Sequence, residues 1–207
     1  MSRGIALTHQ GRAGEAEASY LRALELTGRY GLRVREAVTL RALAALYRKQ
    51  GALDAAQVRL RQALSILDDG EHASALAATL LTLGQVLADQ SHPEARRTLE
   101  SALVACRRLG VGFGQALALK ALGDLCLRQG SPEQAVALCT EVLAIAEGLE
   151  GPPLRGRILR SLGDAHHAAG TRAAARDAWS RARAVHAGLG NRAEVEDLDR
   201  LLSMTGG

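Results

Sequence analysis

Aromatic side chains are scarce in this 207-residue sequence, which holds three tyrosines, one tryptophan and one phenylalanine. The apolar residues are instead dominated by 39 alanines and 35 leucines, both strong helix formers. Because aromatic and β-branched strand formers are sparse, the composition excludes an all-β domain and disfavours an α/β domain. With 47% hydrophobic and 23% charged residues, the chain can still bury a substantial core. An all-α fold is therefore expected.

Long apolar runs and targeting segments are missing as well. The sequence contains no run of 18 apolar residues, which a membrane-spanning helix would need. Its start lacks the charged and apolar regions of a secretory signal. We therefore expect a cytoplasmic protein. The basic residues comprise 24 arginines and only two lysines, a skew that is common in proteins from high-GC genomes.

Cysteine is present only as Cys106, Cys126 and Cys139, without C-x-x-C spacing. This argues against a disulfide framework and against a zinc site. Cys126 and Cys139 are expected to lie near each other as small buried hydrophobic residues rather than as a redox pair.

His166 and His167 are neighbours on one expected helix, where their side chains diverge, so they are not expected to bind a metal. His166 would occupy a core position.

An internal repeat is the strongest feature of the sequence. The segment from Leu122 to Gly130 resembles the segment from Leu162 to Gly170, and related phrases occur earlier in the chain. The residues that close these segments are spaced by 40, 40, 39 and 40 positions, at Gly11, Gly51, Ser91, Gly130 and Gly170. A fixed spacing of this size is the signature of a stacked repeat architecture.

Each repeat contains two helical stripes. Before the closing residue, apolar or small side chains recur at steps of three, one and three, as in Leu119, Leu122, Gly123 and Cys126. After it, steps of four and three mark a second helix. The pattern predicts helix pairs in residues 1–31 (with an incomplete first helix), 32–70, 71–110, 111–151 and 152–190, and a capping helix and tail in 191–207.

Glycines in two kinds of position need separate explanations. Gly51, Gly130 and Gly170 follow a first helix, where a left-handed backbone conformation commonly ends it. Gly84, Gly123 and Gly163 lie inside the first helix, where each costs about 1 kcal/mol relative to alanine. Such a cost in register implies a close crossing by the second helix, and the expected crossing points are Ala95, Ala135 and Ala175.

These patterns resemble the tetratricopeptide repeat, in which Leu-Gly and an aromatic residue precede the turn glycine and small and aromatic residues follow it. The matching positions include Leu83-Gly84, Leu122-Gly123, Leu162-Gly163, Tyr47, Ala56, Ala63, Tyr20, Trp179, Ala175 and Ala182. The period of about 40 exceeds the usual 34, which implies helices about one turn longer, as in kinesin light chains. The resemblance implies a right-handed superhelical array of antiparallel helix pairs, with about eleven helices over residues 1–190 and the capping helix.

The sequence contains no catalytic or phosphate-binding motif of the kinds G-x-S-x-G, G-x-x-x-x-G-K-[ST] or H-E-x-x-H. The glycine-rich segment 110–114 follows an expected helix rather than a strand and lacks a lysine, so a helix–helix loop is the better interpretation. We therefore expect a non-enzymatic protein without a cofactor or metal.

The resemblance implies that the first helix of each unit lines a concave groove. Carried onto this chain, the candidate partner-binding residues are Arg41, Arg48, Lys49, Gln85, Lys120, Asp124, Arg128, Arg157, Arg160, Asp164 and His167. Their mainly basic character suggests an acidic peptide or a small anion as the partner. The alternative is that Lys120–Asp124 and Arg160–Asp164 are ordinary i,i+4 pairs on a solvated face.

Nucleic acid is a poor candidate partner despite the net charge of +4. The charge is +5 in residues 1–50, −3 in 51–100, −1 in 101–150 and +3 in 151–207, whereas a phosphate-binding stripe is continuous. The few aromatic residues are expected to occupy core positions, which would leave no stacking surface. Direct binding of DNA or RNA is therefore not expected.

The two ends differ in character. The first unit begins inside a helix, which suggests a fragment of a longer chain and an apolar edge that could form a homodimer. At the other end, Asn191 could cap a helix over 192–202 whose acidic residues Glu194, Glu196, Asp197 and Asp199 face water.

Two functions fit this architecture. The first is a scaffold that binds a peptide or protein segment, or another domain of its parent chain. The second is an effector-sensing domain of a larger transcriptional activator, because segments such as 162–170 and 174–182 resemble the C-terminal repeat regions of actinobacterial activators of the antibiotic-regulatory and LuxR types.

Overall fold

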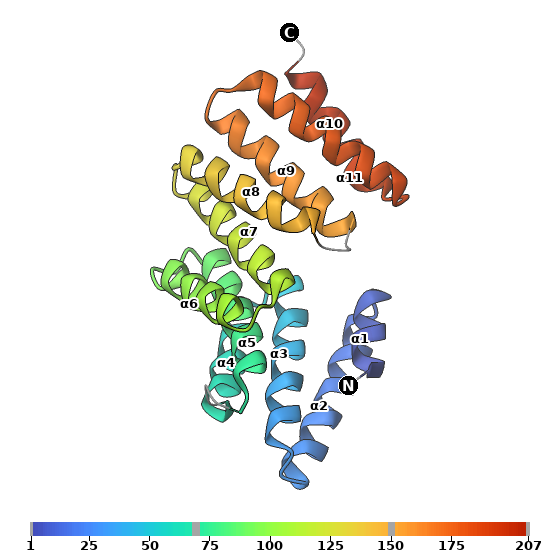
Figure 1. The fold of residues 1–207 in the computed structure, drawn as a ribbon. Helices are drawn as coiled ribbons and strands as arrows, with labels where there is room; N and C mark the ends of the chain where they lie inside the picture. The colour runs from blue at the N-terminus through green and yellow to red at the C-terminus, as the bar shows by residue number, and fades with distance from the viewer. Residues whose placement is uncertain (1, 68–70, 149–151, 206–207) are drawn as a thin grey trace. The chain divides into compact units, whose positions relative to one another are not determined.

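The computed structural model describes residues 2–67, 71–148 and 152–205. In these ranges it contains eleven α-helices and no strands, which confirms the expected all-α class. Figure 1 shows their order. Their bounds are α1 Ser2–His9, α2 Ala13–Arg29, α3 Arg33–Lys49, α4 Leu53–Ile66, α5 Ala73–Asp89, α6 Ala95–Arg108, α7 Gly112–Arg128, α8 Pro132–Glu147, α9 Pro152–Ala168, α10 Arg172–Gly188 and α11 Arg192–Met204.

The chain divides into two compact units, which are described separately. The first spans residues 1–110 and contains α1 to α6, and the second spans 111–207 and contains α7 to α11. Within each unit consecutive helices pack against each other, and the first helices of successive repeats also touch: α3 contacts α5, and α7 contacts α9. Side chains on these first helices are therefore brought together within each unit.

A left-handed residue ends most of the helices. Gly51, Gly130 and Gly170 have φ values of 77°, 71° and 77°, as predicted. The next amide then bonds back into the helix, as when the N–H of Ala52 donates to the carbonyl of Tyr47. Ser91 takes the same position in its repeat with a φ of 55°, the one non-glycine residue with positive φ among the described residues.

The glycines inside the first helices do face the second helix, but the nearest residue is not the expected alanine. A Cβ on Gly84 would lie 2.6 Å from Cδ2 of Leu99, and one on Gly163 would lie 2.3 Å from Cδ1 of Trp179. At Gly123 the nearest atom is Sγ of Cys139, at 3.2 Å, and the carbonyl oxygen of the expected Ala135 follows at 3.7 Å. Each glycine thus makes room for the residue one helical turn beyond the expected Ala95, Ala135 or Ala175.

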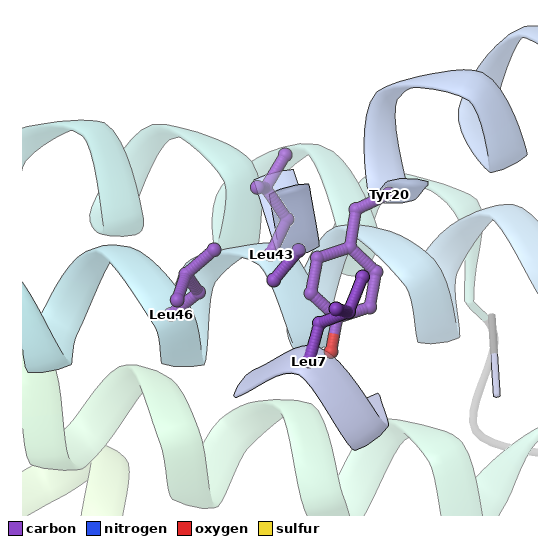
Figure 2. Packing of buried hydrophobic residues seen from close by; sticks show 5 residues of the cluster. Leu7, Tyr20, Leu43 and Leu46 are labelled. Atoms are coloured by element: carbon purple, nitrogen blue, oxygen red, sulfur yellow. The ribbon is translucent and has the colours of Figure 1, made fainter. Parts of the chain in front are cut away.

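The core of the first unit begins with a cluster around Tyr20. Leu7 from α1, Tyr20 from α2 and Leu43 and Leu46 from α3 are all buried and pack together. Figure 2 shows the tyrosine ring lying against Leu7 and Leu43. A Cβ on Gly4 would approach this ring to 2.7 Å, so the glycine of α1 makes room for a ring of the next helix, as Gly163 does for Trp179.

The last helix departs from expectation in two respects. Asn191 stands at its N-cap position, but its side chain forms no capping hydrogen bond. The acidic residues were expected to face water, but several of them form ion pairs. Asp199 pairs with Arg183 of α10, and Glu194 pairs with Arg160 of α9. Leu198 is the helix's fully buried anchor among the described residues. Charge pairing therefore supplements a small apolar contact in holding α11.

Candidate functional site

Arg48 on the first unit's α3–α5 face is already neutralised. Its Nε donates to Oδ2 of Asp89 at 2.5 Å, and its Nη1 donates to Oε1 of Gln85 at 3.3 Å. These bonds join α3 to α5 across 37 and 41 residues of sequence. Two of the expected partner-binding residues, Arg48 and Gln85, are thus brought together, while Lys49 is exposed. The pairing lowers the positive charge that this face offers to a partner.

Arg41 stands on the same helix without such a partner. Its Nε is buried and forms no hydrogen bond to any described residue. Burial lowers the pKa of the Arg41 guanidinium from its ordinary value, because desolvation disfavours the charged form. An arginine remains protonated at neutral pH all the same. Arg41 is therefore a partly buried positive charge with unused donor capacity.

On the second unit, an ordered polar network crosses the face formed by α7 and α9. Nζ of Lys120 donates to Oδ2 of Asp124 at 2.7 Å, and the hydroxyl of Ser161 donates to the other carboxylate oxygen at 2.9 Å. The expected Lys120–Asp124 pair is therefore present. The sequence analysis did not identify Ser161 as a site residue, although it directly follows the candidate Arg160 in the sequence.

Asp164 does not pair with Arg160 in the expected i,i+4 manner. Its Oδ1 accepts a hydrogen bond from Nε1 of Trp179 at 2.9 Å. Burial raises the pKa of the Asp164 carboxyl, and the bond from Trp179 and the nearby charge of Arg160 offset part of that rise. Asp164 thus serves mainly to satisfy a buried indole N–H.

Arg160 reaches the terminal helix instead. Its Nη1 lies 2.6 Å from Oε2 of Glu194 and 3.7 Å from Oδ2 of Asp197, both on α11. Burial alone would lower the pKa of Arg160, but the bond to Glu194 and the charges around it raise it overall. Neither carboxylate was predicted from sequence as a site residue, because the repeat spacing does not show that α11 packs beside Arg160.

The remaining candidates are exposed. Arg128 and Arg157 are open to solvent, and no ion pair to a described residue involves them. His167 is exposed too, but its ring stacks in a tilted arrangement on Trp179, with centroids 5.4 Å apart. The eleven candidates therefore separate into paired groups, solvated groups and the half-buried cation Arg41.

Other chemically capable side chains are placed as structural residues. Cys106, Cys126 and Cys139 are buried free thiols. Burial, together with the charge of Asp124, raises the pKa of Cys139 to about 12. His166 is half-buried and bonds to the hydroxyl of Thr171, so its expected core position is only partly realised.

The described residues contain no cluster of three or more histidine, cysteine, aspartate or glutamate side chains that could hold a metal ion. In the same part of the chain, no helix has the length and apolarity needed to cross a membrane.

Comparison with known proteins agrees with this geometry. The family model described as tetratricopeptide repeat matches residues 1–69, 75–148 and 114–187. Among curated proteins, none matches the sequence.

Several solved structures share the fold. Aspartyl phosphate phosphatase F from Bacillus subtilis is 16% identical, with a TM-score of 0.85 over 99% of this chain and 54% of that one. A STAND protein with a tetratricopeptide repeat sensor from Pyrococcus horikoshii is 17% identical, with a TM-score of 0.82 over 99% of this chain and 32% of that one. PlcR from Bacillus thuringiensis, solved with the peptide PapR7 and DNA, is 13% identical, with a TM-score of 0.80 over 95% and 71%.

Proposed function

The chain belongs to the tetratricopeptide repeat family, and on that premise we propose that it is a non-catalytic scaffold. It binds a peptide or protein segment along the first helices of its repeats, and the bound segment carries acidic groups. PlcR, which has a similar fold and was solved in complex with the peptide PapR7 and DNA, supports a peptide partner. Such a segment would belong either to a separate protein or to another domain of a longer parent chain.

Arg41 is the observation that carries the proposal. Arg48, Lys120 and Arg160 are each neutralised by a carboxylate of this chain, namely Asp89, Asp124 and Glu194. Arg41 keeps a buried Nε without a hydrogen bond to any described residue. A buried donor left unpaired costs about 1–3 kcal/mol, and an incoming carboxylate would remove that cost. A partner's acidic side chain at Arg41 would thus supply a carboxylate to Nε, as Glu194 supplies one to Nη1 of Arg160.

Synthetic peptides rich in aspartate and glutamate, without large apolar residues, test this binding. We expect them to bind the protein in a salt-sensitive manner, and Arg41→Gln to weaken binding about tenfold, which equals about 1.4 kcal/mol. Arg22→Gln, which removes an exposed arginine of the same unit, is the matched control and should bind as the wild type does. Absence of binding, or equal affinity in the Arg41→Gln variant, would contradict the proposal.

The second candidate is an effector-sensing domain of a larger transcriptional activator of the actinobacterial kind. The Pyrococcus STAND protein, in which a similar fold serves as a sensor, supports it. Native mass spectrometry of the purified protein distinguishes the two: a retained small molecule supports sensing, and a retained peptide supports the scaffold. A nucleotide-binding domain in the parent chain would also favour the sensor.

A further inference from the structure

A second recognition surface lies where α2 turns into α3. A cavity of about 600 Å³ opens there, lined by Ala23, Leu26, Thr27, Tyr30, Leu32, Arg35 and Thr39. Leu26, Tyr30 and Leu32 remain 55%, 66% and 42% exposed. The expected core position was therefore wrong for Tyr30, as it was for Phe113, which is 50% exposed. Large apolar side chains exposed together around a concavity are typical of a binding site rather than of ordinary surface.

The polar groups of this lining are already satisfied within their own helices. The hydroxyl of Thr27 donates to the carbonyl of Leu24, and the hydroxyl of Thr39 donates to the carbonyl of Arg35. Neither hydroxyl therefore requires a polar ligand. An occupant would be held in the cavity by apolar contact, and the Arg35 guanidinium would be the charged group beside it.

The rim of the cavity is basic. Arg29 lies over the ring of Tyr30, 6.0 Å from its centroid, and Arg33 and Arg35 are exposed on the first turn of α3. No ion pair with a described residue involves these arginines. The neighbouring carboxylates on the same two helices are Glu25 and Glu36, so a net positive charge remains around the cavity.

We propose that this cavity, here called the α2–α3 pocket, docks an acidic segment that carries a large apolar anchor residue. The anchor side chain enters between Leu26, Tyr30 and Leu32, and the flanking carboxylates pair with Arg33 and Arg35. The lining of the pocket includes neither Arg41 nor Arg48. This inference therefore does not depend on the proposed function.

The test uses the full chain and three synthetic peptides. The first peptide combines leucine and phenylalanine with several aspartates and glutamates. The second replaces its apolar residues with serine, and the third replaces its acidic residues with lysine. We expect the first peptide alone to perturb the amide shifts of Thr27, Tyr30 and Arg35, because the acidic serine peptide binds at Arg41 and has no side chain that fills the pocket.

Variants locate the site. Leu26→Glu and Arg35→Glu should each weaken the binding of the first peptide, measured at these pocket amides, about tenfold or more. Leu189→Glu, at an exposed leucine of the second unit, should leave that affinity unchanged. Circular dichroism of each variant verifies that the helices remain folded.

The proposal is overturned if the first peptide leaves the amides of Thr27, Tyr30 and Arg35 unperturbed, or if the serine or lysine peptide perturbs them as strongly. It is also overturned if Leu26→Glu leaves the affinity measured at these amides unchanged. A further contrary outcome is a wild-type dimer in sedimentation experiments that Leu26→Glu converts to monomer, because a second copy would then be the occupant of the pocket.

Discussion

The indole ring of Trp179 fills the space that a side chain at Gly163 would need. A Cβ on Gly163 would lie 2.3 Å from Cδ1 and 2.4 Å from Nε1 of that ring. Trp179 is buried and its Nε1 is bonded to Asp164, so the ring cannot easily move aside. We expect Gly163→Ala to lower the free energy of unfolding by about 1–3 kcal/mol, as overpacked cores do. Urea denaturation measures the change.

Gly123→Ala is the matched control for this prediction. There the nearest atom to the new Cβ is Sγ of Cys139 at 3.2 Å, which a small shift can relieve. The substitution also gains about 1 kcal/mol of helix propensity. Its free energy of unfolding should therefore stay within about 1 kcal/mol of the wild-type value. Equal destabilisation by both substitutions would show that ring size does not explain the glycine.

The turn at Ser91 offers a stabilising substitution. Its φ of 55° places it in the left-handed region, which costs an L-residue roughly 1–2 kcal/mol and glycine very little. We expect Ser91→Gly to raise the free energy of unfolding by about 1 kcal/mol, measured by thermal or urea denaturation. The reciprocal substitution Gly51→Ser, at a φ of 77°, should lower it by a similar amount. An unchanged or lowered stability of Ser91→Gly would contradict this account.

The repeat register made most of the fold predictable, because periodicity determines which residues of one helix share a face. It identified the helix pairs and the left-handed glycines Gly51, Gly130 and Gly170. Periodicity does not determine which atoms of two helices meet. Glycines such as Gly163 were therefore matched to a second-helix alanine, when the contacting residue lies one turn further on.

The candidate site was less predictable for the same reason. The sequence shows that Arg41, Lys120 and Arg160 occupy the same position in three repeats, but their partners come from different elements. Lys120 bonds within its own helix, Arg160 bonds to α11, and Arg41 has no partner among the described residues. Local spacing predicts the first of these cases. The other two depend on how neighbouring helices pack, and the i,i+4 rule predicts only pairs within one helix.

Cys139 makes a contribution to stability that disappears at alkaline pH. Its pKa is raised from 9.0 to about 12 in the folded chain, first by burial and then by the charge of Asp124. Between these values the unfolded chain loses the thiol proton and the folded chain keeps it. Stability from this group is thus complete below pH 9 and falls by about 1.4 kcal/mol per pH unit toward pH 12.

The difference between wild type and Cys139→Ala isolates this effect from tyrosine and lysine titration. The stability gap between the two proteins should be constant up to pH 9 and then narrow as the pH rises. A thiol reagent should also react with Cys139 only as fast as the chain opens. Rapid labelling of Cys139 in the folded protein, or a gap that does not change with pH, would contradict the assigned burial.

The bond between Asp164 and Trp179 leads to a prediction about two substitutions at one position. Burial raises the pKa of Asp164 in the folded chain. The carboxyl group therefore favours folding most when it is protonated, and that contribution is lost as the pH rises from the unfolded pKa near 3.8 through the folded value. Asparagine keeps an oxygen acceptor for Nε1 and does not ionise, so at neutral pH Asp164→Asn should match or exceed the wild-type stability.

Asp164→Ala should behave in the opposite way, because it leaves the buried Nε1 of Trp179 without its acceptor. The expected loss is about 1–3 kcal/mol of unfolding free energy. Trp179 is the sole tryptophan of the chain, so its fluorescence reports both the hydrogen bond and the ionisation of Asp164. The wild-type emission should titrate at a pH above 3.8, and the emission of Asp164→Asn should not titrate there. If Asp164→Asn is as unstable as Asp164→Ala, then the negative charge, and not the acceptor oxygen, is what the folded chain requires at this position.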